Sequence, residues 1–327
     1  MEHEVTGPVA LCVGGALNPA AVGWSRTPLH DCAIAGSWGR RKRWHHWAVT
    51  SRAHVAMVTV ADLDYVGIAS VAVIELGEGK WRERVAVRPL GWRGAALPER
   101  ASAGAFAVSA MGLRVAIEDD AGGARLLARG QGFELDMKVT RPPGHQTLNI
   151  ALPLSDGFQF TSKQAALPAE GEVRVGRHVA RFGGHGQGDD ALACLDFGRG
   201  VWPYRTEWNW AAAHGRVGAH MLGLNLGGRW TDFGGVTENG LVVDGVLHKI
   251  EDRVVFSHDG DDVRRPWHIH GPGVAVTVHP CGDRKARLPL GVASARLEMA
   301  LGHFEGRVLD FDVTGLFGWA EEFHARW

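Results

Sequence analysis

Residues 53–76 decide the fold and read Ala-His-Val-Ala-Met-Val-Thr-Val-Ala-Asp-Leu-Asp-Tyr-Val-Gly-Ile-Ala-Ser-Val-Ala-Val-Ile-Glu-Leu. Both halves of this stretch are rich in β-branched residues, which favour strands over helices. The polar Asp62-Leu63-Asp64 between them is typical of a turn. The stretch therefore predicts two consecutive antiparallel strands joined by a short connection.

The same pattern extends along the chain: short apolar runs alternate with glycine, proline and aspartate. Asp119-Asp120-Ala121-Gly122-Gly123 and Asp244-Gly245 each predict a hairpin turn. Only the last segment, residues 315–327, is expected to form a short helix. Further strands are expected near residues 82–88, 105–108, 113–118, 124–128, 132–139, 148–152, 221–226, 254–257 and 274–278. This spacing predicts an all-β meander.

The length of 327 residues and an internal similarity both favour two domains. Trp44 and Trp210 are 166 residues apart, and the pairs that begin at Ala53 and Ala219, each Ala-His, have the same separation. Both tryptophans precede an apolar strand, as expected for a tandem repeat. We expect two antiparallel β-barrel or sandwich units, at residues 1–160 and 161–327.

Composition excludes several classes of protein. The formal net charge of −1 gives no support for a nucleic-acid partner. No apolar run approaches the roughly 18 residues of a membrane-spanning helix. The four cysteines form no zinc-binding spacing and fit a reducing compartment, so a cytoplasmic location is expected. Neither a Gly-x-Ser-x-Gly motif nor a dinucleotide-binding fingerprint is present, which argues against a serine hydrolase or a Rossmann oxidoreductase.

The most distinctive stretch, residues 196–210, reads Asp-Phe-Gly-Arg-Gly-Val-Trp-Pro-Tyr-Arg-Thr-Glu-Trp-Asn-Trp. It is followed by Gly-Leu-Asn-Leu-Gly-Gly, Thr-Glu-Asn and Asp-Gly-Val-Leu-His-Lys-Ile. Phe-Thr-Ser-Lys-Gln lies upstream at 160–164, and Arg-Pro-Trp at 265–267 and Trp-Ala-Glu-Glu at 319–322 lie downstream. Together these motifs resemble the bacterial family known as domain of unknown function 2804, over most of the chain.

This resemblance implies a fold and no established activity. The family is distantly similar to calycin-like and lipocalin-like tandem-barrel proteins, which include carotenoid hydratases, tocopherol cyclases and terpene cyclases. The resemblance thus implies a two-lobed β structure with an apolar cavity, in agreement with the repeat. Because one fold supports many functions, the site residues have to carry the functional argument.

Tryptophans are the candidate ligand-binding residues. In a strand, Trp208 and Trp210 point to the same face, where they either line an apolar cavity or fill a core. We expect Trp230 and Trp267 to border the same internal cavity, in the second half of the chain, with polar side chains at its edge. The candidates for that edge are Lys163, which could bind an anionic group, and Asn225.

Carboxyl groups are the candidate catalytic residues. Burial raises the pKa of a carboxylic acid, which can then donate a proton near neutral pH. Glu238 and Asp196 lie within apolar segments of the family motifs and are the best candidates, although a structural role for Glu238 is equally consistent with the sequence. Asp244 is better explained by its turn.

A metal site and a cofactor are not expected. His268, His270, His279 and Cys281 offer zinc-binding side chains at alternate positions of two segments that could form a hairpin. However, histidine is abundant in this chain, with 17 residues, and the family pattern requires none of these four.

Two functions remain open at the level of the sequence. The first is a cofactor-independent hydratase, cyclase or isomerase that protonates a polyene or terpenoid-like substrate, with the tryptophan faces stabilising the cation. The second is a non-catalytic carrier of a hydrophobic metabolite or acyl lipid. Both of these functions require an apolar small-molecule ligand. A third interpretation is a purely structural or protein-interaction module.

Overall fold

The computed structural model describes residues 1–184, 190–232, 234–290 and 293–327. Strands are the dominant secondary structure among these residues, and the only helix among them is the short 3₁₀ segment η1 (Pro19–Ala21). Two large sheets contain thirteen and ten strands, and every strand pair within them is antiparallel. The expected all-β fold with two antiparallel units is confirmed.

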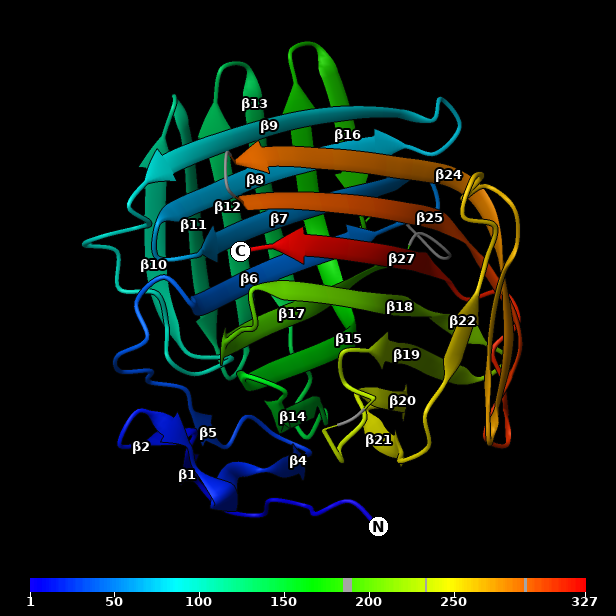
Figure 1. Cartoon of the computed structure of the whole chain (residues 1–327). Coiled ribbons are helices and arrows are strands. Elements are labelled where there is room, and N and C mark those ends of the chain that lie inside the picture. Colours follow the sequence, from blue (N-terminus) through cyan, green and yellow to red (C-terminus); the bar gives the residue numbers. More distant parts are fainter. Residues whose placement is uncertain (185–189, 233, 291–292) are drawn as a thin grey trace.

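The first sheet curls into a nearly closed barrel (Figure 1). Its edge strand β9 (Lys80–Pro89) comes to lie beside β10 (Gly104–Ala110) at the opposite edge. Between these edges the order is β11 (Leu113–Asp120), β12 (Gly123–Gly130), β13 (Phe133–Thr140), β15 (Gly157–Val175), β17 (Ala191–Val201), β6 (Arg41–Thr50), β7 (His54–Asp62) and β8 (Val66–Glu75), with β4 (Gly23–Ser25), β14 (Leu148–Leu154) and β16 (His178–Phe182) attached at the side.

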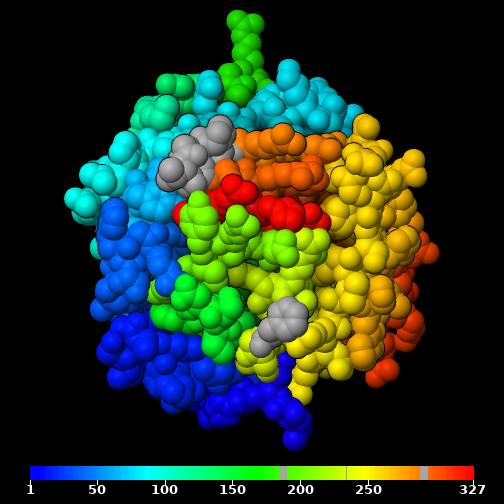
Figure 2. All heavy atoms as spheres, in the orientation of Figure 1, coloured from blue at the N-terminus to red at the C-terminus, as the bar shows by residue number. Residues whose placement is uncertain are grey.

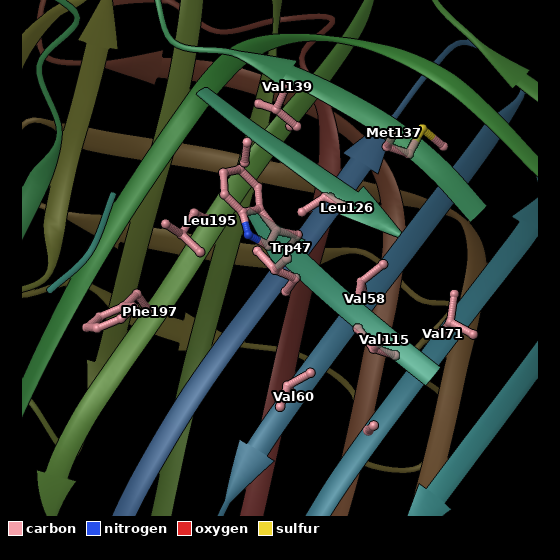
Figure 3. Close-up of a cluster of buried hydrophobic side chains, with 14 of the residues drawn as sticks. Trp47, Val58, Val60, Val71, Val115, Leu126, Met137, Val139, Leu195 and Phe197 are labelled. Carbon is pink, nitrogen blue, oxygen red and sulfur yellow. The ribbon is translucent and has the colours of Figure 1, made fainter. Parts of the chain in front are cut away.

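Alternate side chains of these strands fill the inside of the barrel. Trp47, Val58, Val71 and Leu195 come from four neighbouring strands and are completely or almost completely buried (Figure 3). The period of two along each strand sends the residues between them to the outside of the barrel. In β6 to β8 these outward residues are also buried, so another layer must cover them.

The second sheet provides that layer as a half-barrel. Its central strands β18 (Arg205–Val217), β27 (Phe317–Arg326) and β25 (Ala293–Val308) lie against the outer face of β6 to β8 (Figure 1). In the space-filling view, orange and red atoms of this sheet form part of the near face of the molecule (Figure 2). Ala48, Met57 and Ala72 of the barrel pack there with Trp210 and Trp319. The complete order is β21 (Val246–Ile250), β20 (Asn239–Val243), β19 (His220–Arg229), β18, β27, β25, β24 (Val274–Leu290), β23 (Trp267–Gly271) and β22 (Val255–Ser257), with β26 (Phe311–Asp312) beside β25.

Two local predictions are confirmed by the strand pairing. Asp244 and Gly245 both have positive φ angles, 49° and 84°, and connect β20 to β21 as a two-residue turn. The sequence offset of 166 residues relates the β6–β7 hairpin to the β18–β19 hairpin, with His54 and His220 beginning the second strand of each. The repeated sequence thus corresponds to a repeated supersecondary unit.

The prediction of a helix at residues 315–327 is wrong. This segment forms β27, which pairs with β18 on one side and β25 on the other. Ala320, between Trp319 and Glu321, is also buried, so burial in this strand does not follow a strict period of two. Pairing on both edges outweighs the local preference of alanine and glutamate for helix.

The change from one sheet to the other occurs between Val201 and Arg205. Strands β15 to β17 therefore belong to the first sheet. The division of the chain into two units at residues 1–160 and 161–327 concerns which segments fold together, and it stays a prediction. The N-terminal segment contains the short strands β1 (Val9–Ala10), β2 (Cys12–Val13), β3 (Ala16–Leu17) and β5 (His30–Asp31). It contacts the second sheet through a buried ion pair of 2.8 Å between Glu2 and Lys249.

Among the described residues, we found no helix with the length and apolar character needed to cross a bilayer.

Candidate functional site

A cavity of about 440 Å³ lies between the barrel and the second sheet. Its barrel side is a row of laterally paired residues that crosses four strands. Lys163 of β15 pairs with Asp196 of β17, Asp196 with His46 of β6, and His46 with Thr59 of β7. All four line the cavity. Because paired residues in neighbouring strands share a face, the register alone brings these polar side chains together.

The second sheet contributes two rows of its own. In the first row, Trp210 of β18 pairs with Glu321 of β27, which pairs with Met299 of β25. In the parallel row, Trp208 pairs with Phe323. All five residues line the cavity, so the expected common face of Trp208 and Trp210 is the face that looks onto the barrel.

Lys163 is the electrostatic centre of the site. Its Nζ lies 3.0 Å from Oδ1 of Asp196, 3.6 Å from Oε2 of Glu238 and 3.9 Å from the ring centroid of Trp210. Burial by itself would lower the pKa of Lys163, but the two carboxylates outweigh it and the pKa is raised. Lys163 is therefore a fixed positive charge, and Asp196, which also accepts a hydrogen bond of 2.8 Å from Thr161, is its principal partner.

Glu238 is a buried carboxyl group, and the space for its side chain depends on a glycine in a neighbouring strand. It precedes β20, and only 4% of the residue is exposed. A Cβ atom at Gly227 of β19 would lie 2.2 Å from Cγ of Glu238, so only glycine leaves room for this side chain. Burial raises the pKa of Glu238, and the charge of Lys163 partly offsets the effect. Glu238 thus places a carboxyl group with a raised pKa on the cavity, close to the cation of Lys163.

Glu321 is a second buried acid, which the sequence analysis did not single out. Its Oε1 accepts a hydrogen bond of 3.1 Å from Nε1 of Trp208, and 6% of the residue is exposed. Burial raises its pKa from 4.5 to about 7, although the Trp208 hydrogen bond and the charge of Lys163 act in the opposite direction. At neutral pH this group can both donate and accept a proton.

Aromatic rings form the apolar wall of the cavity. Trp208 stacks on Phe323 with ring centroids 4.0 Å apart, and the centroid of Trp230 lies 5.2 Å from that of Trp208. Trp202 completes the wall, 5.0 Å from Trp230. These π faces suit an apolar or cationic ligand. Trp202 also escaped the sequence analysis, because it follows β17 and is not on the strand that carries the tryptophan pair.

His46 supplies a neutral base on the barrel side. Its Nδ1 lies 2.7 Å from the Thr59 hydroxyl, and burial lowers its pKa to about 4, with a smaller opposite contribution from Asp196. The cavity therefore combines two acids with raised pKa values, an imidazole with a lowered pKa and an aromatic wall. Such a site can move a proton within an apolar substrate.

Comparison with known proteins was made at the level of sequence and of fold. The sequence profile of the family described as Domain of unknown function (DUF2804) matches residues 2–327. The chain belongs to this family. No curated protein matches its sequence.

Three solved structures show that the fold of this DUF2804 protein also occurs elsewhere. Kievitone hydratase from Nectria haematococca has a TM-score of 0.57 at 12% identity, covering 86% of this chain and 88% of its own. CghA with Sch210972 has a TM-score of 0.53 at 11% identity, with 92% and 89% covered. A Nitrosomonas europaea protein described as a candidate AttH has a TM-score of 0.51 at 14% identity, with 96% and 98% covered. At these identities the likeness concerns the fold alone.

The structure of this DUF2804 chain brings most of the sequence-derived candidates to one place. Lys163, Asp196, Glu238, Trp208, Trp210 and Trp230 all line the cavity. Asn225 lies behind it, where its Oδ1 accepts a hydrogen bond of 2.8 Å from Trp210 and its Nδ2 donates one of 2.5 Å to the backbone of Glu238. Asn225 thus positions two cavity residues.

Trp267 and the histidine group lie elsewhere in this DUF2804 chain. Trp267 is fully buried in the core of the second sheet and stacks on His258 at 3.7 Å. His268 and His270 are exposed on β23, while His279 bonds to Glu305 at 2.8 Å. Within the described residues these histidines and Cys281 do not form a group with metal-binding distances.

Glu321 could have been found from the family motif. The motif Trp-Ala-Glu-Glu at 319–322 places an acid two residues after a tryptophan, and Phe323 follows at the same spacing. In a strand, these three side chains share one face, so a carboxyl group is predicted on an aromatic surface. The expectation of a helix at this segment concealed the pattern.

Proposed function

We propose that this protein is a cofactor-independent enzyme that hydrates, cyclises or isomerises an apolar polyene or terpenoid-like molecule by proton transfer. The observation that carries the proposal is the pair of buried carboxyl groups, Glu238 and Glu321, on an aromatic-walled cavity between the two sheets. Acids with raised pKa values keep the proton that protonation of an alkene needs.

The proposed reaction begins with proton transfer from Glu321 or Glu238 to one carbon of a double bond. The positive charge that appears on the other carbon is stabilised by the faces of Trp208 and Trp230. Water, or a second double bond of the same substrate, then attacks that carbon. The proton released by the attacking water, or from a carbon beside the cation, returns to the carboxylate directly or through His46.

The sequence analysis names Asp196, like Glu238, as a candidate catalytic acid. Its contacts favour a different part in the proposal, since Lys163 lies 3.0 Å away and Thr161 donates a second hydrogen bond. We propose that Asp196 keeps Lys163 charged and in place beside Glu238. The kievitone hydratase among the structural neighbours supports a hydration on this fold, as its name states that activity.

A carrier of a hydrophobic metabolite or acyl lipid is the second candidate. It is favoured by the same aromatic wall and by Lys163, which could meet an anionic group at one end of a ligand. In either case we propose a cytoplasmic protein with a small-molecule partner and no nucleic-acid partner. The four cysteines are all free, in agreement with a reducing compartment.

Farnesol, an isoprenoid alcohol with three double bonds, can separate the two functions. Binding is followed by quenching of tryptophan fluorescence, and turnover by deuterium incorporation into farnesol-derived products in D₂O. We expect the wild-type protein to bind farnesol and to form deuterated product. Glu321→Gln and Glu238→Gln should still bind it, with at least tenfold less deuterium incorporated by one or both variants.

The matched control is Glu305→Gln, because the Glu305 carboxyl group is exposed and does not line the cavity. This variant should behave as the wild type. Binding without deuterium incorporation in every protein would leave the carrier as the better account. Absence of quenching by farnesol at its solubility limit, with wild type and control alike, would contradict both functions for this substrate class.

A further inference from the structure

Three potential metal ligands meet at one end of the barrel, outside the cavity. His54 is the first residue of β7 and Glu75 the last of β8, and the two are direct partners across the β7–β8 hairpin. His178 is the first residue of β16. One ligand atom from each of these three side chains lies within 4.8 Å of the others, and Nε2 of His178 is 3.5 Å from Oε2 of Glu75.

Strand alternation directs all three side chains toward the inside of the barrel. His54 shares its face with Ala56 and Val58, Glu75 with Val73, and His178 with Ala180, and these four neighbours belong to the barrel core. Two imidazoles and a carboxylate therefore lie at the end of an interior that is mainly apolar. Polar groups are tolerated beside such a core when they are paired, and a bound cation would pair with all three side chains at once.

We propose that His54, Glu75 and His178 bind a divalent transition metal of the zinc type. Two histidines and one glutamate are a known zinc ligand set, in which a fourth position stays open for water or an external ligand. Tetrahedral zinc with bonds of about 2.0–2.1 Å needs ligand atoms about 3.3–3.4 Å apart. The distance from His178 to Glu75 already meets this value. The side chains of these two residues are 28% and 33% exposed, so small rotations can bring the third ligand in and solvent can reach the ion.

The metal would join parts of the barrel that share no hydrogen-bonded ladder. Among the described strands, β16 pairs only with β15, whereas β7 and β8 lie on the other side of β17 and β6 in the strand order. An ion held by all three ligands would therefore tie β16 to the β7–β8 hairpin across the barrel opening. His54 is five residues before Thr59 on β7, about 17 Å along the strand, so the metal site is separate from the cavity.

Zinc alone is the probe for this site. The full-length protein is stripped with EDTA and dialysed against Zn²⁺, and bound metal is quantified at equilibrium. The variants are His178→Ala and Glu75→Gln, with the exposed pair H268A/H270A as control for binding to surface histidines. Absorption of Co²⁺ in place of Zn²⁺ reports the geometry, since tetrahedral sites absorb strongly in the visible. Far-UV circular dichroism checks the fold of each variant.

The expected result is one Zn²⁺ per chain in the wild type and in the control, a tetrahedral Co²⁺ spectrum, and at least tenfold weaker binding in both site variants. Glu75→Gln changes one atom type and should keep its fold, so loss of binding there cannot be ascribed to unfolding. Equal binding by all four proteins, or loss confined to the H268A/H270A control, would overturn the assignment. Stripped wild-type protein that takes up no Zn²⁺ would overturn it as well.

Discussion

The Glu321→Gln substitution should change how stability depends on pH. In the unfolded chain this carboxyl group has the ordinary pKa of 4.5, and burial raises it to about 7 in the folded protein. Between these two values the unfolded state releases the proton and the folded state keeps it. Glu321 therefore lowers stability progressively as the pH rises through this window, and the loss is complete above pH 7. The difference in pKa corresponds to about 3 kcal/mol of unfolding free energy.

Glutamine keeps an oxygen that can accept the hydrogen bond from Trp208 and has no proton to lose. Relative to the wild type, the variant should gain about 2–3 kcal/mol of unfolding free energy between pH 5 and pH 8. Urea denaturation followed by tryptophan fluorescence at several pH values measures this difference, and other titrating groups cancel in the comparison. A difference between the two proteins that stays constant from pH 5 to pH 8 would refute the assignment of a raised pKa to Glu321.

Lys163→Met should lower the unfolding free energy by about 3–5 kcal/mol at pH 7 in urea denaturation, because Asp196 and Glu238 are left buried without their cation; an unfolding free energy equal to that of the wild type would contradict this explanation. Gly227→Ala should lower the unfolding free energy by about 1–3 kcal/mol and weaken farnesol binding, because the added Cβ would occupy the space of the Glu238 side chain. Unchanged stability and binding would show that this space is not needed. Trp267→Ala should lower the unfolding free energy by about 3–5 kcal/mol, because it leaves a cavity in the core of the second sheet, and farnesol binding per folded molecule should not change. A selective loss of farnesol binding would place Trp267 at the ligand.

The sequence predicted the strands better than their packing. The hairpin at Asp244-Gly245 depends on two positive φ angles that a local dipeptide favours, so it could be recognised directly. The alternation that puts Trp208 and Trp210 on one face is equally local. By contrast, β27 is a strand because β18 and β25 pair with its two edges, and no property of residues 315–327 alone reveals those partners.

The composition of the site depends on register, which the sequence does not reveal. His46 and Asp196 are 150 residues apart and become neighbours only because β6 pairs with β17. The cavity then forms because the second sheet covers the outer face of the barrel, whereas the sequence analysis placed the tryptophans around a cavity within the second half. Trp267 was grouped with them by residue type, but it fills the core on the other side of its sheet.

The central claim is that the space between the two sheets holds an apolar molecule, and native mass spectrometry of the freshly purified protein tests it most directly. Ala286 lines the cavity, so Ala286→Trp should fill part of it, while Ala105→Trp places the same side chain on an exposed position of β10 as a control. We predict a bound apolar molecule, co-purified or supplied as farnesol, on the wild type and on Ala105→Trp, and its loss from Ala286→Trp. Equal occupancy in all three proteins, or none in the wild type after incubation with farnesol, would contradict the claim.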